Sequence, residues 1–444
     1  MIVAVAIALG AAAGCATAAR PSAPDPFIAA LDAYVEPLVR MHDFAGTVLV
    51  ARGGRTLAAR RYEPSADGVR VRPDSTARYA IGSITKTMTA AAIMTLVDRG
   101  AVRLSSPART YLPGLALDSV TVFHLLAHSS GVPDYFGWAE YAAGRERPLD
   151  DAAFVAVVSG KPLDFRPGTS SRYSSTGYRV LGAIIERVSG EPYERFVRSQ
   201  VLEPAGLRAS GDLAARQPGD DIVPGEDPGF PPSWVQPGAR VDVSWLKASG
   251  SAFASAHDLY MWGEVNRARW AADSTRIARA GGWGARTRFG RKMMETTGRI
   301  PTGYASYLGV YPVDDIVVVV LSHIQSAVTD QMGIDIAGLL LREAITPPRR
   351  RGGIDPRYAP HATTLVVYAG RYEIAPGFVL AVRSEPAGLS LAGPDGVFLP
   401  LDAEAADTFF FRPLYVPITF KRDAAGHVAA LDWSGQFTAR RVGQ

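Results

Sequence analysis

Ser83 and Lys86 lie three positions apart near the start of a helical segment, and their side chains have complementary chemistry. A serine hydroxyl is a weak nucleophile at neutral pH and needs a neighbouring group to take its proton. Residues three apart share one face of a helix, so the Lys86 amine can reach the hydroxyl and act as that base once it is desolvated. The spacing therefore indicates nucleophilic catalysis by a serine. The alternative is a solvated lysine at a helix end.

The helix that would hold this pair is defined by signals at both of its ends. An apolar run follows Lys86, and the pattern predicts a helix from about Ser83 to Asp98. Gly82 and Ser83 fit the N-terminal cap, and Gly100 fits the left-handed position that ends a helix. This arrangement would place the Ser83 oxygen at the positive end of the helix dipole.

A second pair with the same spacing, Ser244 and Lys247, receives little weight. The segment from Val241 to Leu246 alternates apolar and polar residues and predicts a strand, in which an odd spacing sends two side chains to opposite faces. Only five of the 47 basic residues are lysines. Because lysine can lose its proton near neutral pH and arginine cannot, this scarcity favours a chemical role for Lys86.

The composition is that of a globular protein. With 444 residues and 47% hydrophobic content, the chain can bury one large core or two domains. Its formal net charge of +4 and isoelectric point near 9.1 are mild for this length. Arg349 to Arg351 are clustered beside prolines, which fits a solvated linker. No nucleic-acid-binding motif accompanies these charges, so no nucleic-acid partner is expected.

The N-terminus has the pattern of a targeting segment. The apolar run from Ile2 to Ala13 is shorter than the about 20 residues that span a bilayer, and it is followed by Cys15, the single cysteine. A cysteine after small residues at this point resembles the lipobox of bacterial lipoproteins. We therefore predict a signal peptide over residues 1–15, lipidation of Cys15, and an exported protein anchored to the membrane and facing the periplasm or cell surface. A plain export signal is the alternative.

The order of predicted elements indicates one domain with strands at both ends. Strands are predicted at 45–51 and 56–62, mainly helical structure from 83 to about 262, strands at 304–311 and 316–322, and a helix over 328–344. This order predicts an α/β (α+β) fold over residues 25–346, with an antiparallel sheet assembled from both ends and flanked by helices, and a mainly helical insertion.

The sequence changes character after residue 346. Residues 347–361 are rich in proline, glycine and arginine and predict a linker. Short alternating runs separated by turns follow, such as Phe378 to Val382 and Ile418 to Phe420. Residues 362–444 therefore predict a small all-β domain.

Three ordered segments carry a resemblance to a known family. Residues 75–87 (STARYAIGSITKT), 122–135 (VFHLLAHSSGVPDY) and 166–178 (RPGTSSRYSSTGY) resemble the motifs of the β-lactamase-related serine hydrolases, which include class C β-lactamases, D-alanyl-D-alanine carboxypeptidases and esterases. The resemblance covers about Phe27 to Ile345. It implies a β-lactamase/transpeptidase-like fold, and the last 80 residues are similar to the lipocalin-like β-domain often appended in this family.

The resemblance implies roles for several residues. Ser83 would be the acylated nucleophile, Lys86 would keep it deprotonatable, and Tyr173 would share the base and proton-shuttle work. The backbone amides of Ser83 and Arg299 would form the oxyanion hole. The third motif would contain Thr296, Thr297 and Gly298, which would contribute to the oxyanion hole or bind the substrate. The resemblance implies no cofactor.

Two positions depart from the family pattern. Ser175 stands where an asparagine usually offers its amide to the substrate, and Thr296 stands where lysine or histidine is usual. Substrates with a carboxylate would lose their expected anchor. Arg299, Lys292 or Arg291 are the candidates to supply charge instead, with Glu295 offsetting part of it.

His124 and His128 invite a metal-site interpretation, because they are four residues apart. No acidic third ligand follows at zinc spacing, so we expect two packing histidines and no metal. The sequence also contains no Gly-x-Ser-x-Gly elbow, which argues against an α/β-hydrolase triad.

These observations together predict a serine hydrolase that cleaves a small ester, amide or peptide through a Ser83 acyl-enzyme. The two departures favour uncharged esters or small amides. A β-lactamase or D-alanyl-D-alanine carboxypeptidase is the first alternative, and an envelope ligand-binding protein that has lost catalysis is the second.

Overall fold

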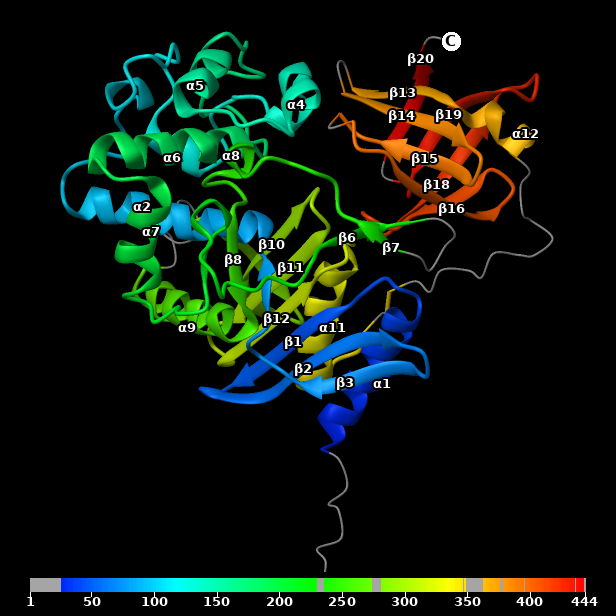
Figure 1. The fold of residues 1–444 in the computed structure, drawn as a ribbon, viewed down its shortest axis with the longest axis horizontal. Coiled ribbons are helices and arrows are strands. Elements are labelled where there is room, and N and C mark those ends of the chain that lie inside the picture. Colours follow the sequence, from blue (N-terminus) through cyan, green and yellow to red (C-terminus); the bar gives the residue numbers. More distant parts are fainter. Residues whose placement is uncertain are drawn as a thin grey trace, which may run out of the picture.

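The computed structural model describes residues 25–229, 235–273, 281–345, 347–348, 362–375, 378–394, 396–435 and 437–442. They form a larger part built on a seven-stranded sheet and a smaller closed barrel (Figure 1). The predicted signal segment with Cys15, and most of the predicted linker, lie outside the described residues. Within the described ranges, no helix has the length and apolar character needed to cross a membrane.

The large sheet is antiparallel and joins the two ends of the larger part. Its strands are β1 (Gly46–Arg52), β2 (Arg55–Ser65), β3 (Gly68–Pro73), β9 (Gly284–Arg288), β10 (Arg291–Ile300), β11 (Tyr304–Tyr311) and β12 (Ile316–Ser322), in the order β3-β2-β1-β12-β11-β10-β9. The central pairing runs from Gly46 opposite Ser322 to Arg52 opposite Ile316. The prediction of a sheet assembled from both ends is confirmed.

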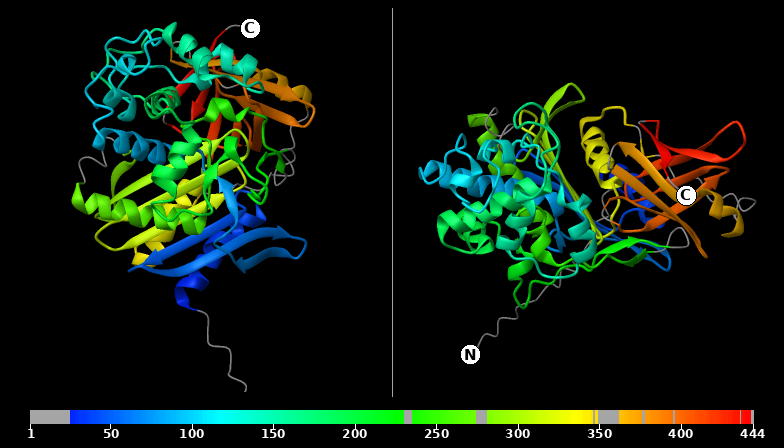
Figure 2. Two further views of the ribbon diagram at one scale, coloured as in Figure 1. Left: turned by 60° about the vertical axis from the view of Figure 1, so that its left-hand side comes forward. Right: turned by 90° about the horizontal axis from the view of Figure 1, so that it is seen from above.

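Both faces of the central strands are buried, which explains why their sequences are continuous apolar runs. Alternate residues enter two cores: Val48 and Val318 lie in one, and Leu49 and Val319 in the other. Helices α1 (Pro26–Arg40) and α11 (Val328–Leu341) cover the first face, and α9 (Ala256–Ala272) packs against the second. The helices are visible on both sides of the sheet in Figure 2.

The insertion between β3 and β9 is mainly helical, as expected. Its helices before α9 are α2 (Thr85–Asp98), α3 (Val122–Leu126), α4 (Ala139–Gly144), α5 (Asp151–Ser159), α6 (Ser175–Ser189), α7 (Tyr193–Val197) and α8 (Val243–Leu246). It also contains short strands that were not predicted: β4 (Arg78–Ala80), β5 (Gly211–Asp212), β6 (Glu226–Pro228), β7 (Val235–Pro237) and β8 (Ala252–Ser255). Helix α2 lies at the centre and packs against α6 and α7.

The strand predicted from Val241 to Leu246 is wrong, because this segment contains helix α8. Asp242 caps the helix by accepting the backbone N–H of Ser244. Aspartate is a preferred N-cap residue, and this local signal outweighs the short alternation. The Lys247 ammonium lies 3.2 Å from Asp151 and 2.6 Å from Glu186, so this second lysine belongs to a structural charge cluster.

The C-terminal part is a closed eight-stranded barrel. Its strands are β13 (Gly370–Ala375), β14 (Phe378–Glu385), β15 (Gly388–Ala392), β16 (Leu399–Ala405), β17 (Thr408–Phe411), β18 (Val416–Arg422), β19 (Val428–Trp433) and β20 (Phe437–Val442). Helix α12 (Ala362–Leu365) precedes the first strand. The expected all-β domain is thus confirmed as a barrel with its own apolar core.

The turn between β17 and β18 attaches the barrel to the larger part. Ala327 N–H donates to the Pro413 carbonyl (2.9 Å), and the Tyr415 hydroxyl donates to Asp43 (3.2 Å). Arg412 is fully buried, contacts Asp402 within the barrel and donates to the Gly229 carbonyl next to β6. These contacts hold the barrel beside α4 and the β6–β7 pair, as Figure 1 shows.

Candidate active site

Ser83 lies on a single tight turn, η1 (Gly82–Ile84), that leads into α2. Gly82 has φ +50°, and a Cβ at this residue would lie 2.9 Å from the Arg299 backbone nitrogen. A Cβ on Gly298 would lie 2.0 Å from the Ile81 oxygen. Only glycine allows these two backbones to approach so closely. The Arg299 amide is therefore held beside the nucleophile turn, as the predicted oxyanion hole requires.

Lys86 is buried beneath Ser83 in the first turn of α2, with 2% of its surface exposed. Its ammonium donates to Ser83 Oγ (3.1 Å), to the Ser249 carbonyl (2.7 Å) and to Ser175 Oγ (3.4 Å). Ser175 is itself buried, so at this position the serine contacts the lysine and does not line the cleft. Ser249 was not predicted, because it acts through its backbone carbonyl.

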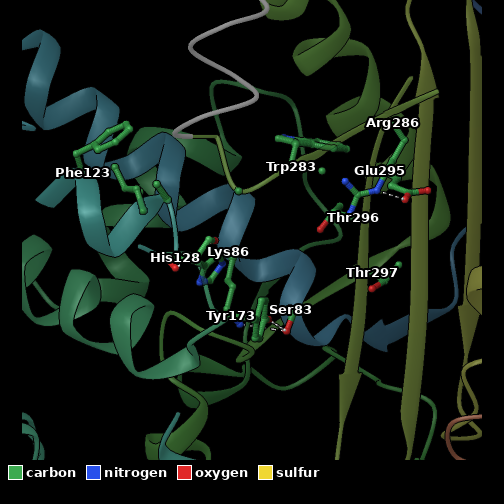
Figure 3. A pocket seen from close by; sticks show the side chains of 15 residues that line it. Ser83, Lys86, Phe123, His128, Tyr173, Trp283, Arg286, Glu295, Thr296 and Thr297 are labelled. Atoms are coloured by element: carbon green, nitrogen blue, oxygen red, sulfur yellow. Dashed lines mark hydrogen bonds and ion pairs between the residues drawn. The ribbon is translucent and has the colours of Figure 1, made fainter. Parts of the chain in front are cut away.

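Tyr173 lies across Ser83 from the lysine. Its hydroxyl donates to Ser83 Oγ at 2.6 Å, and its ring centroid lies 4.8 Å from the Lys86 nitrogen. Figure 3 shows the three side chains pointing toward one another. Tyr173 is 51% exposed although its hydroxyl is hydrogen-bonded in the site, so part of the residue faces open space. The three residues predicted to carry the chemistry are thus brought together.

His128 stacks against Tyr173. The two rings are stacked with centroids 4.6 Å apart, and His128 Nδ1 accepts the Ser174 backbone N–H (3.1 Å). Burial, and to a smaller extent the charge of Lys86, lower the pKa of His128 to about 3. His128 is therefore a neutral packing group at physiological pH, and it lines the cleft, which the sequence did not indicate.

His124 has a separate structural role. Its Nδ1 accepts the Thr121 N–H in a reciprocal cap of α3. Among the described residues, no group of three or more histidine, cysteine, aspartate or glutamate side chains could hold a metal ion.

The opposite wall of the cleft comes from the edge of the sheet. Strand β9 pairs with Arg291 to Glu295 of β10, and the next residues, Thr296 and Thr297, line the cleft. Trp283, which directly precedes β9, and Arg286, in the middle of β9, complete the wall (Figure 3). Neither was predicted, because the strands that bring them to the site were not recognised. The cleft has a volume of about 740 Å³.

The cationic substitutes proposed from the sequence are not available in the cleft. Arg299 pairs with Asp330 of α11 (2.6 Å), and Arg291 pairs with Asp314 and Glu343. Lys292 does not line the cleft. Apart from Lys86, the cation that lines the cleft among the described residues is Arg286, whose charge is partly offset by Glu295, 3.4 Å from its Nε. The wall that faces Ser83 thus offers threonine hydroxyls and a partly neutralised arginine.

A family model described as Beta-lactamase matches residues 31–341, which is most of the chain and contains the whole cleft. The chain belongs to the Beta-lactamase family. The predicted resemblance to β-lactamase-related serine hydrolases is therefore confirmed.

Relatives in this family have several names. The chain is 34% identical over 180 residues to penicillin-binding protein 4* of Bacillus subtilis strain 168, covering 40% of each chain. It is 34% identical over 237 residues to esterase EstB of Burkholderia gladioli, covering 48% of this chain and 59% of that one. The chain thus spans about half the length of the curated relatives it matches.

Several solved structures match nearly all of the chain. The octameric penicillin-binding protein homologue from Pyrococcus abyssi superposes with a TM-score of 0.60 at 20% identity, over 93% of this chain and 99% of that one. At this identity the likeness concerns the fold, and it confirms the predicted β-lactamase/transpeptidase-like fold with an additional all-β part.

Replacing His128 is expected to change how stability depends on pH. The pKa of a free histidine is near 6.5 and that of native His128 is about 3, so between these values the unfolded state binds the extra proton and acid favours unfolding. Relative to pH 7, this residue should lower the free energy of unfolding by about 1 to 2 kcal/mol at pH 5. In His128→Gln, melting temperatures measured from pH 7 to pH 4 should fall less steeply than in the wild type. Parallel profiles would contradict a neutral native His128.

Proposed function

We propose that this protein is a serine hydrolase that cleaves uncharged esters or small amides through an acyl-enzyme on Ser83. The supporting observation is the convergence of Lys86 Nζ (3.1 Å) and the Tyr173 hydroxyl (2.6 Å) on Ser83 Oγ in a cleft of about 740 Å³. A nucleophile within hydrogen-bond reach of two groups that can hold its proton is the arrangement that acyl transfer requires.

The proposed reaction has two half-steps. Ser83 Oγ attacks the substrate carbonyl carbon as its proton passes to the Lys86–Tyr173 pair, with Lys86 present as the neutral amine or Tyr173 as the phenolate. The Ser83 and Arg299 backbone amides donate to the oxyanion, each contributing about 10²- to 10³-fold in rate. The carbon–oxygen or carbon–nitrogen bond then breaks, and the leaving group takes the proton. A water molecule then attacks the acyl-enzyme carbonyl in the same way, which releases the carboxylic acid and restores the Ser83 hydroxyl.

The preference for uncharged substrates is supported by the strand wall. Thr296 carries no charge, and Arg286 is shared with Glu295, so a substrate carboxylate would meet a weak anchor. β-Lactam or D-alanyl peptide hydrolysis is the first alternative. A pure ligand-binding protein is the second, but the buried Lys86 ammonium opposes it, because burying an amine beside a hydroxyl is costly and binding alone does not need it.

Matched esters test the proposed substrate class. We expect kcat/KM for a neutral ester to exceed that for the same ester carrying a carboxylate by about tenfold or more. Thr296→Lys should narrow this ratio by restoring the cation. Thr287→Lys adds the same charge on the exposed part of β9, away from the cleft, and should leave the ratio unchanged. Faster turnover of the carboxylate ester, or of a β-lactam, by the wild type would contradict the proposal.

The proposals of export and of lipidation at Cys15 rest on the sequence pattern alone, because that segment lies outside the described residues.

A further inference from the structure

A second cavity, of about 810 Å³, lies between the barrel and the larger part. Its walls on the larger part come from the segment between Pro133 and Trp138, together with Asp164, Arg172, Tyr173 and Gln325. The barrel supplies most of the apolar walls. The volume is within the range of small-molecule binding sites.

The cavity is one end of the barrel interior. Inward-facing residues alternate along each strand, and they divide by position: Leu380, Leu391 and Phe411 line the cavity, whereas Val382 and Phe409, two positions along their strands, do not. Phe409 packs against the ring of Tyr368, which follows α12 (ring centroids 5.3 Å apart), and α12 contacts β14 and β15. The barrel is thus plugged on the side of α12 and hollow on the side that faces the larger part.

Exposed apolar side chains gather at this opening. Among the described residues, seven large apolar side chains are exposed, and three of them, Tyr173, Phe378 and Leu414, line this one cavity. Phe378 is 46% exposed and Leu414 40% exposed. Leu414 lies in the turn that attaches the barrel, whose hydrogen bonds to the larger part fix its position. Clustered exposed apolar groups around a concave surface are typical of a binding site.

The charged groups at the opening are already partnered. Arg172 forms an ion pair with Asp164 (2.8 Å), and Asp134 accepts the backbone N–H groups of Ser175 and Phe136. The cavity therefore favours an uncharged, apolar ligand.

The two cavities meet at Tyr173, which is the single residue common to their linings among the described residues. Its hydroxyl contacts Ser83, and its ring forms part of the apolar wall. A molecule with its reacting carbonyl at Ser83 can therefore extend past this ring into the barrel.

We propose that the hollow end of the barrel binds an apolar arm of the substrate, an aliphatic or aromatic chain, while the scissile bond lies at Ser83. This inference rests on the proposed hydrolase function and narrows its substrate to esters or amides with a long uncharged chain. The chain can belong to the acyl group or to the leaving group, and two ester series distinguish these cases.

The test measures how kcat/KM depends on chain length. One series is the p-nitrophenyl esters from acetate to octanoate, and the other is the alkyl acetates from ethyl to octyl. In one of them kcat/KM should rise about fourfold per methylene until the cavity is filled. Phe378→Glu and Leu414→Glu should flatten this rise, with the shortest ester of that series affected least. Val313→Glu changes an 88% exposed apolar residue in the turn between β11 and β12, and should keep the wild-type rise.

A binding measurement separates this inference from the proposed function. The neutral fluorophore N-phenyl-1-naphthylamine should bind to the wild type and to Ser83→Ala, and weakly to Phe378→Glu and Leu414→Glu. The inference would be overturned if kcat/KM did not depend on chain length, or if Phe378→Glu and Leu414→Glu kept the chain-length dependence of the wild type. In either case the proposed hydrolase function would be unaffected. Fluorophore binding without hydrolysis of any ester would overturn the hydrolase proposal, and with it the role of the cavity as a substrate site.

Discussion

Replacing Ser83 with alanine is expected to abolish covalent labelling and to lower hydrolysis by roughly 10⁴- to 10⁶-fold. The hydroxyl accepts from both Lys86 and Tyr173, so its removal leaves two proton-handling groups without a nucleophile. Intact mass after exposure to a fluorophosphonate should show one adduct in the wild type and none in Ser83→Ala.

Ser171 provides the matched control for this experiment. It lines the same cleft, but its hydroxyl donates to the His128 carbonyl, whereas Lys86 and Tyr173 donate to Ser83. Ser171→Ala should therefore keep the adduct. An adduct that persists in Ser83→Ala, or is lost only in Ser171→Ala, would contradict the assignment. No adduct in any of the three proteins would favour the ligand-binding alternative.

Replacing Lys86 with methionine is expected to lower kcat by about 10³-fold or more, since it removes the amine that hydrogen-bonds the nucleophile. Methionine is similar in length and apolar, so the variant should fold, and its melting temperature should be at or above that of the wild type, because a buried ammonium is removed from an enclosed site. The measurement pairs ester hydrolysis with thermal unfolding.

Two further variants separate proton transfer from charge. Lys86→Arg keeps a positive charge that cannot be given up near neutral pH, so it should be as inactive as Lys86→Met. Full activity in Lys86→Arg would show that only the charge is needed. Lys247→Met removes the other lysine that follows a serine at this spacing, and should have the opposite profile: normal hydrolysis and lower stability, because Asp151 and Glu186 lose their shared partner.

The sequence predicts the parts of the site that are local. Ser83 and Lys86 share one turn of a helix, so their proximity follows from spacing alone, and Tyr173 is identified because its flanking motif is distinctive. The central strands are equally clear, because burial on both faces makes β11 and β12 continuous apolar runs.

The parts that were missed depend on long-range packing. Ser249 contributes its backbone carbonyl oxygen, and because every residue has such a group, the sequence does not reveal this role. Trp283 and Arg286 reach the cleft only because β9 pairs with β10, and the charged and polar residues of these strands hide the alternation. Arg299 was a reasonable cation for the cleft, but its partner Asp330 lies on a helix that the sequence could not place beside it.

Because β10 packs against Gly82, the site can form only late in the synthesis of the chain. Residues 82 and 298 must touch, yet the ribosome adds the second more than 200 residues after the first. At about 5 to 20 residues per second, this interval is on the order of 10 to 40 s. For that time the serine has no strand wall opposite it, so a nascent chain has no complete cleft with which to bind a substrate. The reactive centre is therefore among the last features of the larger part to form during synthesis.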